Sequence, residues 1–212
     1  MKQRIAKVYR SLYASFGPQH WWPAGTPFEV MVGAILTQNT SWNNVEKAIA
    51  VLHKHKLLSP VKLDKLRNSK LSRLIRPAGY YNIKAKRLKN FLKFFLKKYG
   101  GDTGLMRKGD VSSLRQELLS VNGIGNETAD SILLYALGKP VFVVDAYTRR
   151  IFSRHKFFRD GLDYQTVQDF FEKNTVPSVK LYNEFHALIV KLGKDYCLKN
   201  KPRCTICPLN NK

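Results

Sequence analysis

Residue types that could carry out chemistry are concentrated in two stretches, residues 121–145 and the last sixteen residues. The first has the sequence VNGIGNETADSILLYALGKPVFVVD and ends at one carboxylate, Asp145. In it, Gly123 and Gly125 flank Ile124 at a predicted turn between two short helices. Backbone N–H groups at such a turn, directly before a helix N-terminus, suit a phosphate group, and Ile124 would anchor the turn in the core. An ordinary turn between two helices is the alternative interpretation.

The second stretch contains Cys197, Cys204 and Cys207, spaced as C-x6-C-x2-C within residues 197–212. Three cysteines crowded at one end of the chain do not form the pattern of a disulfide framework. The spacing therefore favours a protein of a reducing compartment.

The charge balance predicts the kind of partner. Lys and Arg total 37 against 15 Asp and Glu, a net charge of +22, while 44% of the residues are hydrophobic. Such an excess on a chain with a normal apolar fraction indicates a polyanionic partner, most often nucleic acid. A generally basic protein is the alternative. No apolar run reaches the roughly 18 residues of a membrane span, and the N-terminus lacks an apolar signal region. We therefore expect a cytoplasmic, nucleoid-associated protein without a membrane partner.

Helices must position these groups, because apolar residues recur at intervals of three and four along most of the chain. No segment shows a strong strand signal, so the predicted fold class is all-α. Capping-box patterns are found at Thr26 to Glu29 and at Ser113 to Gln116, and GGDTGLM at residues 100–106 is expected to be a connector. The predicted helices cover residues 1–16, 27–36, 42–52, a pair within 61–76, 84–98, 113–121, 126–137, 146–155, 163–173 and 178–193.

The segment VNGIGNETADSILLYALGKPVFVVDAYTRR resembles the helix-hairpin-helix and Gly/Pro-Asp segment of the endonuclease III-like DNA glycosylase superfamily. With LTQNT upstream and the cysteine tail downstream, the resemblance covers nearly the whole chain. It implies a two-lobed helix-hairpin-helix fold with a cleft between the lobes. One lobe would be residues 25–137, and the other residues 1–24 together with 138–212. The implied partner is double-stranded DNA that contains a damaged base, bound by a monomer.

The resemblance also implies roles for individual residues. Asp145 matches the catalytic aspartate, which stabilises positive charge on the sugar or orients water while the N-glycosidic bond breaks. Its alternative role is to cap the helix that follows, worth roughly 1 kcal/mol. Bifunctional members carry a nucleophilic lysine where this chain has Glu127, so the implied enzyme is monofunctional and uses water. The hairpin residues implied to hold DNA are Gly123, Ile124, Gly125 and Thr128.

Gln38 matches the polar side chain that members of the superfamily insert into the gap left by a flipped base. A side chain that bonds the local backbone is the alternative for this residue. His186 lies within an apolar helix, so a core or hydrogen-bonded role is expected for it rather than a catalytic one.

The segments WWPA and LTQNTSW resemble the 3-methyladenine glycosylase branch of this superfamily. An N-alkylated purine is cationic and is attracted to electron-rich rings, on which a flipped base can stack. We therefore expect a base pocket lined by Trp21, Trp22, Pro23 and Trp42. Lys194, before the cysteines, matches a lysine that lies near the pocket in the alkylpurine branch. Packing in the core is the alternative for the tryptophans, and a surface position is the alternative for the lysine.

The implied function is hydrolytic excision of alkylated purines such as 3-methyladenine. A mismatch-specific uracil, thymine or adenine glycosylase is one alternative, and a non-catalytic DNA-binding module is another.

The cysteine segment KPRCTICPL resembles the iron–sulfur loop of endonuclease III. The implied cofactor is a structural [4Fe–4S] cluster held by Cys197, Cys204 and Cys207. Such a cluster takes four thiolates, and the fourth cysteine of the family would fall just past Lys212. A three-coordinate site and loss of the cluster are the alternatives.

Overall fold

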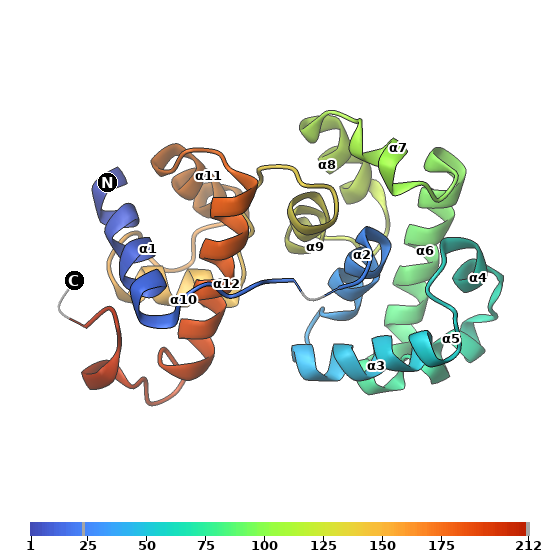
Figure 1. The fold of residues 1–212 in the computed structure, drawn as a ribbon, viewed down its shortest axis with the longest axis horizontal. Coiled ribbons are helices and arrows are strands. Elements are labelled where there is room, and N and C mark those ends of the chain that lie inside the picture. Colours follow the sequence, from blue (N-terminus) through green and yellow to red (C-terminus); the bar gives the residue numbers. More distant parts are fainter. Residues whose placement is uncertain (23, 211–212) are drawn as a thin grey trace. The chain divides into compact units, whose positions relative to one another are not determined.

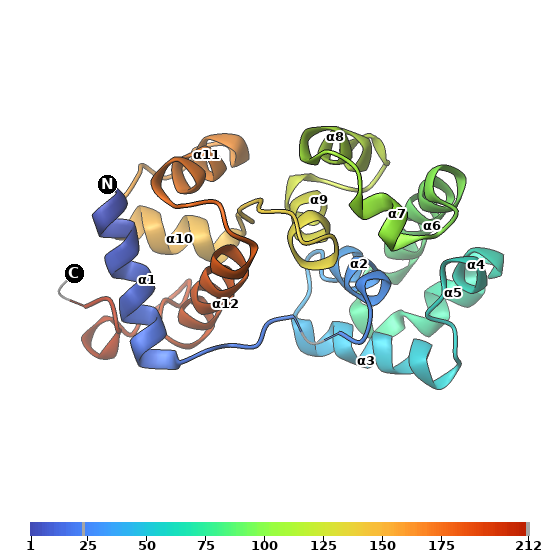
Figure 2. The same cartoon turned by 45° about the horizontal axis from the view of Figure 1, so that its top comes forward.

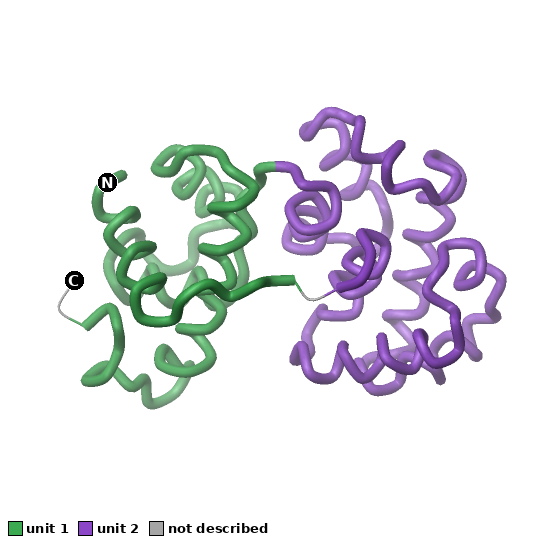
Figure 3. The backbone as a smooth tube through the Cα atoms, viewed as in Figure 1, with its two compact units in different colours: residues 1–23, 140–212 green, residues 24–139 purple. Residues whose placement is uncertain are grey.

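The computed structural model describes residues 1–22 and 24–210, and within them it contains helices and connecting segments but no strand (Figure 1). The predicted all-α class is therefore confirmed. The chain forms two compact units (Figure 3). Unit 1 comprises Met1–Pro23 and Pro140–Lys212, and unit 2 comprises Ala24–Lys139. None of the described helices is long and apolar enough to cross a membrane.

Unit 1 is built from both ends of the chain. Its helices are α1 (Lys2–Phe16), α10 (Ala146–Arg154), α11 (Tyr164–Asn174), α12 (Val179–Asp195) and the 3-10 turn η3 (Cys204–Ile206). The long helix α12 packs against both α1 and α10 (Figure 2). It is the element on which the unit is assembled.

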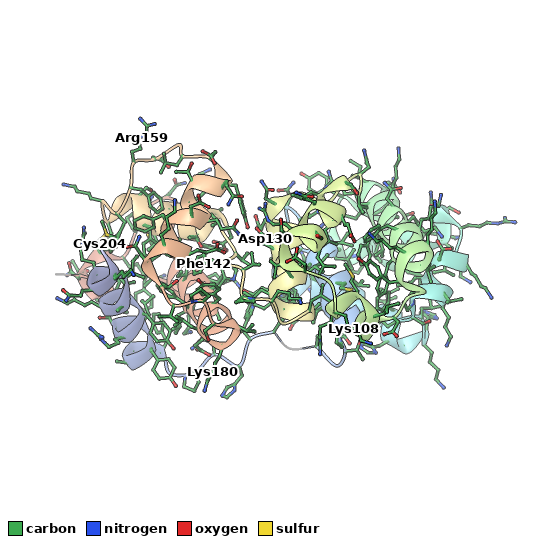
Figure 4. The ribbon with its side chains drawn as sticks, turned by 90° about the horizontal axis from the view of Figure 1, so that it is seen from above. Lys108, Asp130, Phe142, Arg159, Lys180 and Cys204 are labelled. Atoms are coloured by element: carbon green, nitrogen blue, oxygen red, sulfur yellow. The ribbon has the colours of Figure 1, made fainter. Side chains whose placement is uncertain are left out.

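An aromatic cluster forms the interior of unit 1. Phe142, labelled in Figure 4, stacks on Phe171 of α11 with ring centroids 4.1 Å apart. Tyr182 and Phe185 of α12 approach the same ring edge-on, at 5.3 and 6.0 Å. Edge-on and stacked pairs stabilise beyond the area they bury, by about 0.5–1.5 kcal/mol each. Because Phe142 lies in the segment just before Asp145, this packing fixes the approach to that carboxylate.

Unit 2 contains the remaining helices. They are α2 (Pro27–Leu36), α3 (Trp42–Lys54), α4 (Pro60–Lys65), α5 (Asn68–Leu74), η1 (Arg76–Ala78), α6 (Tyr81–Tyr99), α7 (Thr103–Arg107), α8 (Val111–Ser120), α9 (Asn126–Ser131) and η2 (Ile132–Ala136). Helix α2 contacts α3, α6, α9 and η2, which explains why its sequence is apolar nearly all round.

One lysine is part of the core of unit 2. Lys84 on α6 is 1% exposed, and its Nζ donates to the carbonyls of Leu36 at 2.8 Å and Ala78 at 2.7 Å. Those carbonyls end α2 and η1, where the helix itself supplies no donor. Burial, together with the nearby charge of Arg87, lowers the pKa of Lys84 to about 8. This ammonium therefore joins two helix ends at neutral pH.

Two predictions of local structure are wrong, both because an aspartate caps a helix. Helix α8 begins at Val111, not at Ser113, since Asp110 Oδ2 accepts a hydrogen bond from Ser113 N at 2.9 Å. The expected connector at 100–106 contains helix α7, which Asp102 caps by accepting from Gly104 N at 2.7 Å.

The helix that follows the hairpin changes pitch before it ends. Helix α9 continues into the π-helical turn η2, in which Leu137 N donates to Ile132 O at 3.1 Å. Gly138 then ends the helix with φ +63°, a conformation that suits glycine. The residues predicted to face inward are buried, namely Ala129, Ile132, Leu133, Ala136 and Leu137.

Candidate functional site

Asp145 lies in unit 1 at the N-terminus of α10, whose first residue it caps. Its Oδ1 accepts hydrogen bonds from Thr148 N at 2.7 Å and Thr148 Oγ1 at 2.8 Å. Its Oδ2 lies 3.6 Å from Nε2 of His186 on α12. Asp145 is 8% exposed, so the carboxylate is largely removed from bulk water. The predicted cap is confirmed, and it uses one of the two oxygens.

The segment before Asp145 is held by side chains of α11. Phe142 N donates to Glu172 Oε1 at 2.9 Å, and Gln168 Nε2 donates to Phe142 O at 2.8 Å. Val144 N donates to the hydroxyl of Tyr164 at 3.2 Å. These side chains satisfy buried backbone groups of residues 142–144, which have no neighbouring strand to bond among the described residues. The carboxylate is therefore presented from a rigid support rather than from a mobile loop.

Asp145 is charged at neutral pH. Burial alone raises the pKa of a carboxyl group, but the charge of His186, together with the two donors of Thr148, outweighs it and holds the pKa of Asp145 below its usual value. A buried anion of this kind can stabilise positive charge that develops on a bound molecule.

The glycine hairpin of unit 2 uses its two glycines differently. Gly123 has φ +99°, and a Cβ there would lie 2.3 Å from Cγ of Arg87, so both conformation and packing exclude a side chain. Gly125 has φ −99°, and a Cβ there would meet no atom within 4 Å. Ile124 between them is 5% exposed and anchors the turn. Protein packing therefore accounts for the first glycine but not for the second.

Gln38 joins the hairpin to the segment after α2. Its Nε2 donates to Gly123 O at 3.0 Å and to Thr128 Oγ1 at 2.9 Å. Its Oε1 accepts from Arg87 Nη1 at 2.5 Å. Four residues from three parts of the sequence thus form one network within unit 2. Sequence reasoning found Gln38, Gly123 and Thr128 but not Arg87, which no local pattern marks.

A buried ion pair connects the two helices of the hairpin. Asp130 on α9, labelled in Figure 4, is 0% exposed. Its carboxylate accepts from Arg115 of α8, at 2.7 Å from Nε and 3.2 Å from Nη2. Two parallel bonds of this kind fix direction as well as distance. No sequence pattern marks this pair, since an arginine and an aspartate fifteen residues apart form no motif.

The predicted pocket residues are distributed over both units. In unit 1, the rings of Trp21 and Trp22 meet edge-to-face with centroids 5.7 Å apart, and Lys194 Nζ lies 5.9 Å from the centroid of Trp21. Trp42 begins α3 in unit 2 and is partly exposed. Pro23 lies outside the described residues. Of the five predicted pocket residues, the structure thus brings together Trp21, Trp22 and Lys194, all in unit 1.

The three cysteines of unit 1 line one cavity. Cys197, Cys204 and Cys207 border a space of about 480 Å³ together with His155 and Arg154. Burial raises the pKa of Cys207, and the charges of the other two cysteines raise it further, as expected for neighbouring thiols. Within residues 1–22 and 24–210, no group of three or more His, Cys, Asp or Glu side chains could hold a metal ion. The donors suit an iron–sulfur cluster chemically, in three of its four ligands.

Two arginines of α10 hold the backbone that leads to these cysteines. Arg150 donates to Cys197 O at 2.8 Å and to Gly193 O at 3.0 Å. Arg154 donates to Leu198 O at 2.6 Å, and its Nη1 lies 3.5 Å from Cys197 Sγ. The helix that Asp145 caps therefore also supports the cysteine segment.

Known proteins resemble the whole of this chain. The family model described as "HhH-GPD superfamily base excision DNA repair protein" matches residues 32–177. A "Putative DNA repair glycosylase" of Methanocaldococcus jannaschii is 52% identical over 98% of this chain and 94% of its own length. Endonuclease III of Thermotoga maritima is 29% identical over 98% of this chain and 91% of its own. The crystal structure of H. pylori 3-methyladenine DNA glycosylase bound to 1,N6-ethenoadenine is 31% identical, covers 90% of this chain and 97% of that one, and superposes with a TM-score of 0.78.

Proposed function

Because the chain belongs to the HhH-GPD superfamily of base excision DNA repair proteins, we propose that it is a monofunctional DNA glycosylase that excises alkylated purines from double-stranded DNA. Membership of the superfamily confirms the resemblance recognised in the sequence. DNA glycosylase activity follows from the family, whereas the absence of lyase chemistry and the choice of base are our proposals.

Binding to the DNA backbone is assigned to the hairpin. The net charge of +22 attracts a polyanion, and the open side of Gly125, at the N-terminus of α9, allows a phosphate to approach backbone N–H groups. Gln38 is assigned to the space left by the flipped base. It would first have to release Gly123 O and Thr128 Oγ1, which it bonds in this structure.

A substitution at the hairpin separates DNA binding from folding. Gly125→Ala fits the backbone conformation and meets no neighbour, so the free energy of unfolding is expected to stay within about 1 kcal/mol of the wild-type value. The added methyl group lies where the phosphate approaches, and we expect the Kd for duplex DNA to rise about tenfold, which is about 1.4 kcal/mol. Fluorescence anisotropy at fixed salt measures the affinity, and chemical denaturation measures the stability.

Gly123→Ala is the matched control. It combines a positive φ with a 2.3 Å approach to Arg87, so its main effect is expected to be a lower free energy of unfolding, in contrast to Gly125→Ala. Wild-type affinity in Gly125→Ala would remove the hairpin from phosphate binding.

Asp145 is assigned to catalysis. Departure of the base builds positive charge on the sugar, which an anion removed from water stabilises more strongly than an exposed one. Oδ1 is bonded to Thr148, so we assign the reaction to Oδ2, which the cap does not use. The nucleophile in this scheme is water, which the same oxygen can orient.

The observation that carries the monofunctional assignment is Glu127, exposed in the first turn of α9. A bifunctional glycosylase uses an amine at this position to attack the sugar and form a Schiff base. A carboxylate has no such chemistry, but it is favourable near a helix N-terminus. We therefore expect no covalent complex when the protein is treated with borohydride during turnover.

The choice of base rests on Trp21, Trp22 and Trp42. Edge-to-face indole rings present an electron-rich surface to a cationic purine. Lys194 places a positive charge 5.9 Å from Trp21, so a cationic and a neutral adduct should respond oppositely to its removal. We expect Lys194→Met to favour 3-methyladenine over a neutral adduct such as 1,N6-ethenoadenine.

One excision assay tests the proposal. Duplexes carry 3-methyladenine, ethenoadenine, mismatched thymine, uracil or undamaged purines, and each reaction is read with and without alkali, which cleaves the abasic site. Release of alkylated purines with strand breaks only after alkali supports the proposal. Release of uracil or thymine instead would identify a mismatch glycosylase. DNA binding without release of any base would identify a non-catalytic module.

A [4Fe–4S] cluster is assigned to the cavity of Cys197, Cys204 and Cys207. We assign the cluster a structural role, because it would fix the same cysteine segment that Arg150 and Arg154 of α10 bond. We expect the purified protein to contain about four iron atoms per chain and to absorb visible light, and Cys197→Ser to lose both. Iron analysis and an absorbance spectrum measure this, with zinc determined in parallel. A colourless, iron-free wild-type protein would contradict the assignment.

A further inference from the structure

His186 is a buried histidine that belongs to no motif of the sequence. It lies on α12, is 6% exposed, and follows Phe185 of the aromatic core. A core or hydrogen-bonded role was expected for it. The structure places its Nε2 3.6 Å from Asp145 Oδ2, which is an ion-pair distance between two buried side chains.

The two oxygens of Asp145 have separate partners. Thr148 supplies two donors to Oδ1, from its N–H and its hydroxyl, and so satisfies that oxygen within α10. Oδ2 faces α12, where His186 approaches it. Since the cap alone would suffice to start the helix, a second partner on another helix has a different role.

We propose that His186 is a positioning residue for Asp145: its Nε2 pairs with Oδ2, fixes the direction of that oxygen and keeps the carboxylate charged while the glycosidic bond breaks. This inference rests on the proposed glycosylase function. It assigns no contact between His186 and the substrate.

The energetic need for such a partner follows from burial. A carboxylate 8% exposed loses most of its hydration and takes up a proton unless other groups compensate. In this structure burial raises the pKa of Asp145, and His186 is the first of the groups that lower it again. Without His186, only the bonds of Thr148 would oppose burial, and the carboxyl group would become neutral at a higher pH.

The other titratable groups around this pair leave His186 as the main cationic partner. On α10, burial and then the charge of Asp145 raise the pKa of Tyr147, and Arg150 lies over the Tyr147 ring at 5.0 Å. On α12, Glu184 is directed away, since it accepts from Gln19 N at 2.8 Å. From α11, the hydroxyl of Tyr164 accepts from the backbone of Val144.

The test is the pH dependence of single-turnover excision in His186→Leu and His186→Gln. Leucine removes the donor at similar volume, and glutamine keeps an N–H donor at similar reach. We expect the ratio of wild-type to His186→Leu rate to grow as the pH falls, because the acidic limb of the rate profile moves to higher pH. The acidic limb of His186→Gln should lie between those of the wild type and His186→Leu, because glutamine restores an N–H donor but not the positive charge.

Tyr182→Phe is the matched control for loosening of α12, because Tyr182 is buried on the same helix and bonds Thr175 rather than Asp145. Its acidic limb should coincide with that of the wild type. An unshifted limb in His186→Leu would overturn the proposal, and so would a shift of the same size in Tyr182→Phe.

A second readout does not require activity. Selective ¹³C labelling of aspartate carboxyl groups, with the Asp145 signal identified by its loss in Asp145→Asn, follows protonation of this group directly by NMR. We expect its titration to move to higher pH in His186→Leu. An unchanged titration overturns the pairing, whereas a shifted titration in a protein that excises no base supports the pairing and contradicts only the proposed function.

Discussion

Asp145→Asn is expected to lower the single-turnover excision rate by about a thousandfold, the scale on which removal of a charge-stabilising group acts. The substitution exchanges one oxygen for an amide nitrogen and removes the negative charge. Asparagine caps a helix as well as aspartate does, so Thr148 N keeps its acceptor. The aromatic packing of Phe142 and the bonds of α11 to the preceding backbone are untouched. The loss therefore isolates the charge.

Stability and DNA affinity are the controls for this result. The free energy of unfolding of Asp145→Asn is expected to stay within about 1 kcal/mol of the wild-type value, and the Kd for duplex DNA within about threefold, because the cap is retained and the hairpin belongs to unit 2. Asp145→Ala removes the cap as well, and should cost about 1 kcal/mol more stability with no further loss of rate. Full excision activity in Asp145→Asn would exclude Asp145 from the mechanism and leave only its capping role.

Much of the fold follows from local sequence, because periodicity and capping act over a few residues. The helices at residues 1–16 and 163–173 were placed within two residues of α1 (Lys2–Phe16) and α11 (Tyr164–Asn174). The errors at α7 and α8 are also local. The glycines near Asp102 favour a connector, and Ser113 offers an alternative cap to Asp110. The sequence pattern alone therefore does not identify these two aspartates as the N-caps.

The supports of the candidate site could not be predicted in this way, because their partners are distant in sequence. Gln38 bonds residues 85 and 90 positions away, and Gln168 bonds Phe142 across 26 positions. Nothing in a single sequence states which of many arginines or glutamines makes such a contact. His186 shows the same limit: its helical face was predictable, but the carboxylate that it meets depends on how α10 packs on α12.

Close packing of α10 on α12 depends on a glycine. A Cβ on Gly193 would lie 2.3 Å from Cδ1 of Tyr147, so the two helices approach to a distance that no other residue allows. Arg150 then reaches the carbonyl of Gly193 itself. The same approach brings His186 to Asp145, which means that one small residue sets the spacing for both the carboxylate and the cysteine segment.

Removal of Arg115 is expected to cause the largest loss of stability. Arg115→Leu breaks the two bonds to Asp130, whose carboxylate is 0% exposed. Removing one partner of a buried ion pair typically costs about 3–5 kcal/mol, because the remaining charge keeps its desolvation penalty. Thermal and urea unfolding of the variant measure this, and a fall in Tm on the order of 10 °C is expected for a unit of this size.

The matched control is a more exposed salt bridge that joins the same helix, α8, to α6. Lys98 and Glu117 of unit 2 pair with side chains 48% and 24% exposed, so Lys98→Met should cost no more than about 1 kcal/mol. Adding Asp130→Leu to Arg115→Leu replaces both charges with apolar groups and should recover much of the loss. If Arg115→Leu and Lys98→Met cost the same, the buried pair does not hold the hairpin helices together. If the double variant is as unstable as the single one, the cost comes from lost packing and not from the stranded charge.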